Sequence, residues 1–462
     1  MVKEKETSVE KIVAAQRTYF GTGATFSIEE RRRALRKLKA SIKSHEAEIN
    51  AALAADLGKS TMESYMCEVG LTLSELGYME RHLKKWSRPH RVATPLAQFH
   101  ASSFTVRDPY GVVLIMSPWN YPFLLTMEPL IGAIACGNCC VVKPSAYSPA
   151  TSAVMGRIIS ECFPPEFVTV VEGGREENKA LLDQTFDYIF FTGGVTAGKE
   201  VMRHAAEHLT PLTLELGGKS PCVVTDSANL KLAAKRLAFG KVLNCGQTCV
   251  APDYLLIDKR VENEFLGYLK DQIQAMVGAD PFKNDDYVHM INEKHFDRVM
   301  GLIDPAKVYC GGKGDRATLR IQPTILQHVV PEDAVMQEEI FGPVLPVMTY
   351  DNIEEVFAFI KSRPHPLAAY LFTQDKALEK RFLREVTFGG GCINDTIIHL
   401  ATSEMGFGGV GGSGMGSYHG KKSFDTFSHE KSIVKKYTWM DMPVRYAPYT
   451  EFRNKLLRLF LK

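Results

Sequence analysis

Hydrophobic residues recur at helical spacing through the first 85 residues of the chain. The apolar stripe consists of Leu35, Leu38, Ile42, Ile49 and Leu53. Apolar residues three or four positions apart indicate an amphipathic helix, and Gly58 is typical of a helix end. Ser27 and Glu30 have the spacing of a capping box, in which two side chains bond the first backbone N–H groups of a helix. The pattern therefore predicts a helical N-terminal region.

From about residue 110 the pattern changes to short apolar runs that alternate with helix-length segments. The runs cover residues 112–116, 139–142, 168–171 and 188–191. Each run ends in polar, Gly or Pro residues, which is typical of a parallel sheet with crossover helices. Because ligands bind beyond the carboxyl ends of such strands, we expect Asn120, Lys143 and Gly193 on one rim of the sheet.

A second alternation begins near residue 221. It includes the apolar runs 254–257 and 344–348 and a helical segment at 261–277, so it predicts a second α/β domain. The segment 88–108 is rich in Pro, His, Ser and Thr and predicts an excursion from the first domain. The glycine-rich stretch 412–422 has the composition of a mobile loop.

Charge and cysteine content exclude several classes of protein. Fifty-five Lys and Arg residues balance 53 Asp and Glu residues in a chain of 462, which argues against a nucleic-acid partner. The charged start is not followed by an apolar run of signal-peptide length, and no apolar stretch has the length of a transmembrane helix. Ten cysteines are too few for a disulfide scaffold. We therefore expect a cytoplasmic protein without a transmembrane segment.

Cys249, in the sequence Gly-Gln-Thr-Cys, is a candidate nucleophile. It follows a predicted helix, where backbone N–H groups can point at the sulfur and favour the reactive thiolate. From these residues alone, a packing role for Cys249 stays open, whereas Cys136, Cys139 and Cys140 lie in an apolar stretch typical of the core. Cys245 and Cys249 are four residues apart, but no second Cys or His pair has ligand spacing, so we predict no metal site.

Three further positions carry candidate chemistry. Glu215 ends an apolar run before two glycines and is either a loop cap or a general base with a raised pKa. Asn120 lies between two prolines and either closes its own turn or donates to a developing oxyanion. Gly193 and Gly194 form a strand-to-helix turn that suits an anion, although such turns are common.

Taken together, these segments resemble the aldehyde dehydrogenase superfamily, over residues of about 10 to 447. The matching segments are 117–122, 143–145, 191–194, 214–221, 246–249 and 339–344. The glycine-rich segment 406–416 and its continuation to His429 are similar to the class 3 branch, whose members oxidise fatty and aromatic aldehydes. The resemblance implies an α/β fold with a Rossmann-like cofactor domain, a second α/β catalytic domain and a small bridging β region.

The resemblance implies a role for each candidate residue. Cys249 attacks the aldehyde, Asn120 and the Cys249 N–H hold the oxyanion, and Glu215 activates the water that releases the carboxylic acid. NAD or NADP is the implied cofactor. Its expected contacts are Lys143 at the adenosine ribose, Glu339 at the nicotinamide ribose, and Phe341, Trp119, Leu216, Gly193 and Gly194. Adjacency to catalytic positions adds Tyr121, Cys245 and Ile397 as residues near the substrate path.

One departure concerns the choice of cofactor. The family usually has Glu three residues after the ribose-binding lysine, and this chain has Ala146. A carboxylate there accepts from a ribose 2′-hydroxyl and repels a 2′-phosphate. Its absence leads us to expect that NADP is used at least as readily as in most class 3 relatives.

The resemblance also divides the chain. It implies a cofactor domain (1–87 and 108–216), a catalytic domain (217–427), a bridging region (88–107 and 428–447) that pairs two subunits into a homodimer, and a C-terminal tail (448–462). Residues 453–462 are basic and apolar; we favour a packed helix over weak binding to a membrane surface. Two other functions stay open: a thiol acyltransferase or esterase, and a structural protein on an enzyme fold.

Overall fold

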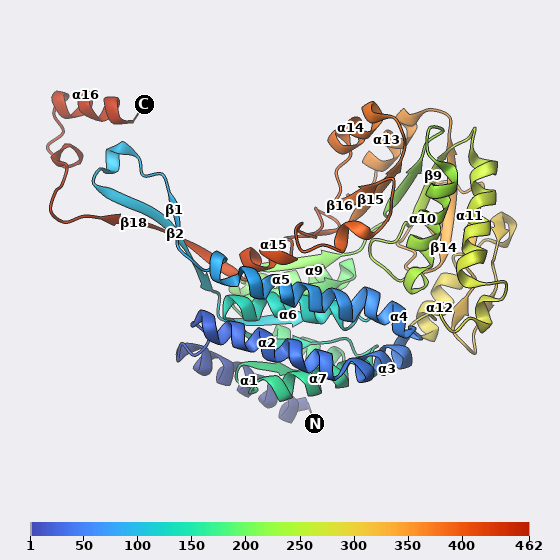
Figure 1. Ribbon diagram of the computed structural model, residues 1–462, viewed down its shortest axis with the longest axis horizontal. Helices are drawn as coiled ribbons and strands as arrows, with labels where there is room; N and C mark the ends of the chain where they lie inside the picture. The colour runs from blue at the N-terminus through green and yellow to red at the C-terminus, as the bar shows by residue number, and fades with distance from the viewer. Residues whose placement is uncertain (1, 462) are drawn as a thin grey trace.

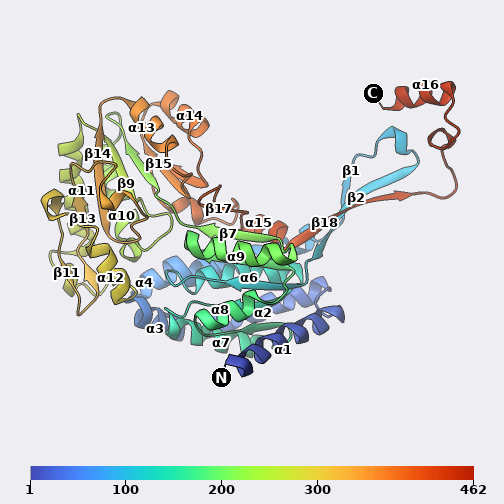
Figure 2. The ribbon, with the colours of Figure 1, turned by 180° about the vertical axis from the view of Figure 1, so that it is seen from behind.

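Two α/β lobes and a thin β arm make up the computed structural model, which describes residues 2–461 (Figures 1 and 2). This architecture confirms the predicted fold class. Residue 1, which begins the expected first domain, and residue 462, which ends the expected tail, lie outside the described residues.

The N-terminal region is helical, as predicted. Its helices are α1 (Val2–Gly21), α2 (Ile28–Ser44), α3 (Glu46–Leu57), α4 (Thr61–Ser64), the π-helix η1 (Tyr65–Val69) and α5 (Gly70–Trp86). Helix α3 ends at Gly58, which has a φ of 72°. The predicted capping box is wrong: the Ser27 side chain makes no capping hydrogen bond, and the Glu30 carboxylate accepts instead from Arg33.

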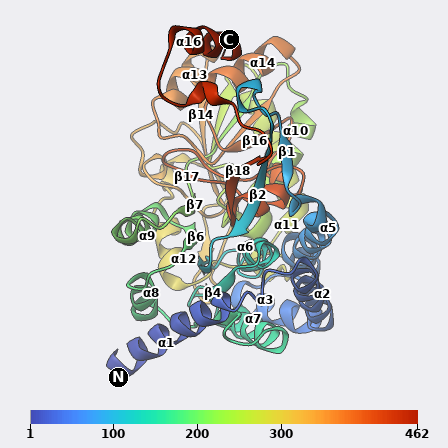
Figure 3. The same ribbon diagram turned by 90° about the vertical axis from the view of Figure 1, so that its left-hand side faces the viewer.

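The first lobe contains a sheet with strand order β17-β7-β6-β3-β4-β5. The predicted runs are its parallel strands β3 (Val112–Met116), β4 (Cys139–Lys143), β5 (Val168–Val170) and β6 (Tyr188–Gly193), joined by β7 (Leu212–Leu216). Helices α1, α8 (Arg175–Leu182) and α9 (Val195–His208) cover one face. Helices α6 (Leu124–Cys136) and α7 (Pro149–Cys162), backed by α2, α3 and α5, cover the other (Figure 3).

The second lobe contains a seven-stranded sheet with order β10-β13-β14-β9-β8-β15-β16, parallel except for β10. Its strands are β8 (Pro221–Val224), β9 (Tyr254–Asp258), β10 (Val308–Cys310), β13 (Thr324–Leu326), β14 (Val344–Tyr350), β15 (Ala368–Phe372) and β16 (Gly390–Ile393). Its helices are α10 (Leu230–Val242), α11 (Glu262–Val277), α12 (Glu293–Met300), α13 (Ile353–Lys361) and α14 (Lys376–Glu385). A short hairpin pairs β11 (Gly314–Asp315) with β12 (Arg320–Ile321).

The arm confirms that segment 88–108 leaves the first lobe. Strands β1 (His90–Val92), β2 (Ala101–Pro109) and β18 (Ser428–Lys436) form an antiparallel sheet that projects from the body (Figures 1 and 2). At its tip the tail forms α16 (Glu451–Phe460), which contacts the short helix η2 (Leu96–Gln98). No helix in residues 2–461 has the length and hydropathy needed to cross a membrane.

The stretch 412–422 is not the mobile loop that its composition indicated. Strand β17 (Gly414–Met415) pairs with β7, and α15 (Gly420–Thr426) packs on α5 and α6. Gly414 has a φ of 135°, and a Cβ there would lie 2.1 Å from the Leu214 carbonyl oxygen. Glycine permits this close approach. These residues, which we expected in the catalytic domain, therefore pack on the first lobe.

Candidate active site

A cavity of about 1180 Å³ is lined by residues from both lobes. Two of the three predicted rim residues line this cavity: Asn120 follows β3 and Gly193 ends β6, whereas Lys143 does not line it. Glu215, in β7, lines the same cavity. The structure brings most of the predicted site residues into this one cavity: Trp119, Asn120, Gly193, Gly194, Glu215, Leu216, Cys249, Glu339 and Phe341.

A left-handed turn presents Cys249 to the cavity. Asn244, Cys245 and Gly246 have φ values of 50°, 53° and 68° in the short helix η3 (Leu243–Gly246), which follows α10. Residues other than glycine rarely adopt this conformation, and strained backbone of this kind clusters at functional sites. The Gln247 side chain braces the turn, because its Nε2 donates to the Asn244 carbonyl at 3.1 Å and to the His289 carbonyl at 3.0 Å.

Asn120 is held through both its backbone and its side chain. Its carbonyl oxygen accepts from Lys59 Nζ at 3.1 Å and from Asn244 Nδ2 at 2.8 Å. Its own Nδ2 donates to the Gln247 carbonyl at 3.0 Å. A side-chain amide has two N–H groups, so one remains for a group in the cavity. Asn120 is therefore a fixed donor and does not merely close its own loop.

Glu215 is a buried carboxyl group on the cavity wall. It is 3% exposed, and neither of its carboxylate oxygens has a hydrogen-bond partner in the described residues. Burial raises the pKa of Glu215 well above its usual value. An unpartnered carboxyl with a raised pKa suits proton transfer rather than the capping of a loop.

The Cys249 thiol is half-buried on the same wall. Burial raises the pKa of Cys249, and the nearby Glu339 and Glu215 raise it further, whereas the backbone N–H groups of Cys249 and Val250 lower it. These N–H groups therefore lie near the sulfur, as the sequence led us to expect. The thiol is protonated at neutral pH in this environment, so its reaction requires a proton acceptor.

Glu339 and Phe341 form the second-lobe side of the cavity. Burial raises the pKa of Glu339 to about 8, the Asp253 charge adds to the rise, and the Gly218 N–H opposes it. The Phe341 ring packs edge-on against Trp119 at 5.3 Å. A Cβ on Gly217 would lie 2.0 Å from Glu339 Oε2, so only glycine fits beside this carboxyl group.

Four predicted residues do not line the cavity. Lys143 Nζ donates to the Pro144 carbonyl at 2.8 Å and the Gly173 carbonyl at 2.7 Å, and burial lowers the pKa of Lys143 to about 8. Tyr121 is buried and its hydroxyl lies 2.7 Å from Thr248 Oγ1.

Cys245 is fully buried, with its sulfur 3.3 Å from the Tyr287 hydroxyl, because the left-handed turn directs its side chain into the second lobe. Ile397 is buried before the short helix η7 (Ile398–Leu400). Adjacency in sequence therefore did not identify cavity residues. The apolar lining of the cavity instead includes Leu125, Phe407 and Tyr418, which we did not predict as site residues.

The cavity suits a dinucleotide. It reaches Gly193 and Gly194, which precede the 14-residue helix α9, and a helix N-terminus favours anionic groups. The cations Arg175, Lys179 and Arg203 lie on the same wall and can neutralise phosphates. The unpartnered Glu215 oxygens leave a polar group free for a ligand in the same cavity.

Comparison with known proteins identifies the family. The model of the aldehyde dehydrogenase family matches residues 1–433. The chain belongs to this family. It is an NAD(P)-dependent aldehyde dehydrogenase, which oxidises aldehydes.

The similar proteins include members of aldehyde dehydrogenase family 3. A 4,4'-diaponeurosporen-aldehyde dehydrogenase of Staphylococcus aureus is 45% identical over 96% of this chain and 97% of its own length. A dimeric, NADP-preferring aldehyde dehydrogenase of Canis lupus familiaris is 43% identical over 96% and 98%. Family 3 member A2 of Rattus norvegicus is 41% identical over 98% and 94%. A substrate-bound structure of Staphylococcus aureus AldH has a TM-score of 0.97 at 44% identity and covers 98% of this chain and 99% of that one.

Replacement of Gly246 by Ala tests the importance of the turn before Cys249. A Cβ at Gly246 would lie 2.3 Å from the Gly342 carbonyl oxygen, and the φ of 68° disfavours any side chain. We expect Gly246→Ala to lower the free energy of unfolding by about 1–3 kcal/mol and to reduce kcat. The control is Gly267→Ala, where no atom lies within 4 Å, and where alanine stabilises helix α11 by up to about 1 kcal/mol. Full activity and stability of Gly246→Ala would show that the turn is dispensable.

Proposed function

We propose that aldehyde oxidation proceeds through a covalent bond between Cys249 and the aldehyde carbon. The observation that carries this proposal is that a thiol, an unpartnered carboxyl group and a fixed amide donor line one cavity, at Cys249, Glu215 and Asn120. The sulfur attacks the carbonyl carbon, the S–H bond breaks, and its proton passes to the aldehyde oxygen, which forms a thiohemiacetal. Covalent catalysis of this kind divides one difficult step into two easier ones.

The negative charge that develops on the aldehyde oxygen has two donors. The free N–H of the Asn120 side chain and the Cys249 backbone N–H hold the oxyanion. Preorganised donors act strongly in a buried site, and loss of one typically costs about 10²–10³ in rate.

Glu215 releases the product. When bound, the dinucleotide supplies the hydride acceptor that turns the thiohemiacetal into a thioester. Glu215 then takes a proton from water, which attacks the thioester and frees the carboxylic acid and the Cys249 thiol. Both Glu215 oxygens lack protein partners, so either can accept from water. The raised pKa of Glu215 makes it a stronger base than an exposed carboxylate.

Residues in the cavity, and Lys143 outside its lining, fit the cofactor. We propose that Glu339 bonds the nicotinamide ribose while Phe341 and Trp119 pack beside the nicotinamide. Lys143, which lies outside the cavity lining, holds the adenosine ribose: two of its three N–H groups bond backbone carbonyls, and the third is available for a ribose hydroxyl. Gly193, Gly194 and Leu216 line the passage between them.

The substrate we propose is a medium- or long-chain aliphatic or an aromatic aldehyde. The apolar side chains of Leu125, Phe407 and Tyr418 lie in the same cavity as Cys249 and favour apolar substituents. A related enzyme is named for 4,4'-diaponeurosporen-aldehyde.

Replacement of Glu215 by Gln separates the two halves of the reaction. Gln keeps the shape but removes the base, so we expect a burst of NAD(P)H equal to the enzyme concentration, followed by steady turnover slowed about 10²–10⁴-fold. Cys249→Ser serves as the control and should abolish the burst. Stopped-flow absorbance at 340 nm measures both phases. Undiminished steady turnover in Glu215→Gln would exclude Glu215 as the base.

We propose that the chain uses NADP as well as NAD, because Ala146 places no carboxylate three residues after Lys143. Ala146→Glu should lower kcat/KM for NADP about tenfold or more relative to NAD, since like charges repel. The conservative control is Ala146→Gln, which adds bulk without charge. Steady-state kinetics with each cofactor measures the effect. A wild-type preference for NAD of about 100-fold or more would contradict the proposal.

We further propose a cytoplasmic homodimer that forms through the arm. Apolar side chains of β18 and the following segment are exposed there, including Val434 at 53% and Trp439 at 68%. Exposed apolar patches of this kind mark interfaces.

Val434→Asp should shift the molecular mass measured by light scattering from that of two chains to that of one. The control is Val195→Asp, because Val195 is an exposed residue on α9, away from the arm. A wild-type monomer would contradict the proposal.

A further inference from the structure

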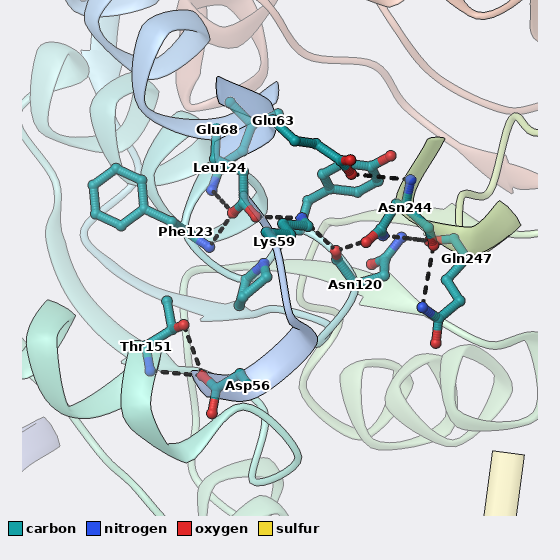
Figure 4. A network of polar contacts seen from close by, with 12 residues as sticks. Asp56, Lys59, Glu63, Glu68, Asn120, Phe123, Leu124, Thr151, Asn244 and Gln247 are labelled. Carbon is teal, nitrogen blue, oxygen red and sulfur yellow. Dashed lines mark hydrogen bonds and ion pairs between the residues drawn. The ribbon is translucent and has the colours of Figure 1, made fainter. Parts of the chain in front are cut away.

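A buried ion pair lies behind the wall of the active site. Lys59 and Glu68 are both fully buried, and Lys59 Nζ lies 2.5 Å from Glu68 Oε1 (Figure 4). Lys59 precedes α4, and Glu68 belongs to the π-helix η1. Neither residue lines the cavity. A buried ion pair adds little net stability once the desolvation of both charges is counted, so stability alone does not account for it.

Lys59 holds the residue that carries the oxyanion donor. Its Nζ donates to the Asn120 carbonyl oxygen at 3.1 Å and lies 4.1 Å from the centroid of the Tyr121 ring. The ammonium group is thus bonded to Glu68, to the backbone of Asn120 and to the face of the next side chain. These three contacts fix the backbone from which the Asn120 amide extends.

Glu68 holds the other end of the same segment. Its Oε2 accepts from the backbone N–H groups of Phe123 and Leu124 at 2.8 and 3.2 Å. Leu124 begins α6, and a carboxylate at the start of a helix bonds its free N–H groups and complements its dipole. The ion pair therefore holds residues 120–124 from both ends.

The turn before Cys249 is held by the same short segment. Glu63, in α4, accepts from the Asn244 backbone N–H at 3.0 Å. Asn244 Nδ2 in turn donates to the Asn120 carbonyl at 2.8 Å and to the Gln247 carbonyl at 3.0 Å (Figure 4). Residues 59–68 thus contact Asn120, which carries one oxyanion donor, and the turn before Cys249, which carries the other.

We propose that Lys59, Glu63 and Glu68 are positioning residues, which fix the Asn120 amide relative to the Cys249 backbone N–H. The proposal rests on the proposed function, because it assigns the oxyanion to these two donors. Donors in an oxyanion site act only when they lie at hydrogen-bond distance from the developing charge. A displacement of about 1 Å can lower a rate about 10²-fold, so the ion pair acts on the chemical step without contacting the substrate.

Glu68→Gln tests this role, because it keeps the size of the side chain and leaves Lys59 without its counter-charge. We expect kcat and the single-turnover rate of NAD(P)H formation to fall about 10- to 100-fold. The dissociation constant for NADH, measured by fluorescence, should stay within about twofold, since the pair lies outside the cavity. Glu63→Ala provides a second variant that leaves the ion pair intact, and it should lower kcat in the same direction.

Asp56→Asn is the matched control. Asp56 lies three residues before Lys59, and its carboxylate accepts from the Thr151 backbone N–H at 2.7 Å in the first turn of α7 (Figure 4). It is therefore a buried acid at the start of a different helix. Asp56→Asn should lower the melting temperature as Glu68→Gln does, but kcat should stay within about twofold of wild type. An equal loss of kcat in both variants would show that Glu68 acts through stability alone.

The decisive experiment repeats the Glu68→Gln replacement in a protein that also carries Asn120→Ala. If Glu68 acts through Asn120, Glu68→Gln should lower kcat less than about threefold once the Asn120 amide is absent. The effects of two coupled residues on a rate are not additive. Equal losses in the two backgrounds would overturn the positioning role. If Asn120→Ala itself retained wild-type kcat, the proposed oxyanion donor would be wrong, and this outcome is separate from the failure of the ion pair.

Discussion

The hydrogen bonds to the Asn120 carbonyl oxygen are the contact on which the active site depends. A carbonyl oxygen has two lone pairs, and here Lys59 and Asn244 occupy both. One donor comes from the N-terminal helical region and the other from the loop between α10 and β9 of the second lobe. The contact therefore joins the rim of the first sheet to the turn that carries Cys249. Without this contact, the two lobes could form the same cavity with the Cys249 thiol and the Asn120 amide wrongly placed relative to each other.

Burial gives this site its chemical character. The Cys249 thiol and the carboxyl groups of Glu215 and Glu339 all have pKa values raised by desolvation. The resting Cys249 thiol therefore holds its proton at neutral pH. In a medium of low dielectric constant, fixed donors stabilise a developing charge more strongly than water does, because they need no reorganisation. In the mechanism that we propose, the oxyanion donors, and not a preformed thiolate, therefore activate the aldehyde.

The sequence pattern was sufficient for the parallel strands and for the rim on which Asn120 and Gly193 lie, since each strand has a continuous apolar run with a polar end. It was insufficient where one side chain acts on distant backbone. The spacing of Ser27 and Glu30 did not reveal that Glu30 pairs with Arg33. Glycine content indicated a mobile loop, yet Gly414 lies in β17 against β7. Lys59 and Glu68 gave no local signal, because the backbone groups of residues 120 and 123 that they bond are 61 and 55 residues away.

The covalent bond to Cys249 is tested most directly by mass spectrometry of the enzyme itself. Wild-type protein, mixed with an aldehyde and NAD+ for less than one turnover and quenched in acid, is digested so that the Cys249 peptide can be weighed. The thioester mechanism predicts an acyl group of the substrate's mass on that peptide, removable by hydroxylamine. Carboxylic acid and NADH that accumulate while the Cys249 peptide stays unmodified, or an acyl group found on another cysteine, would contradict it.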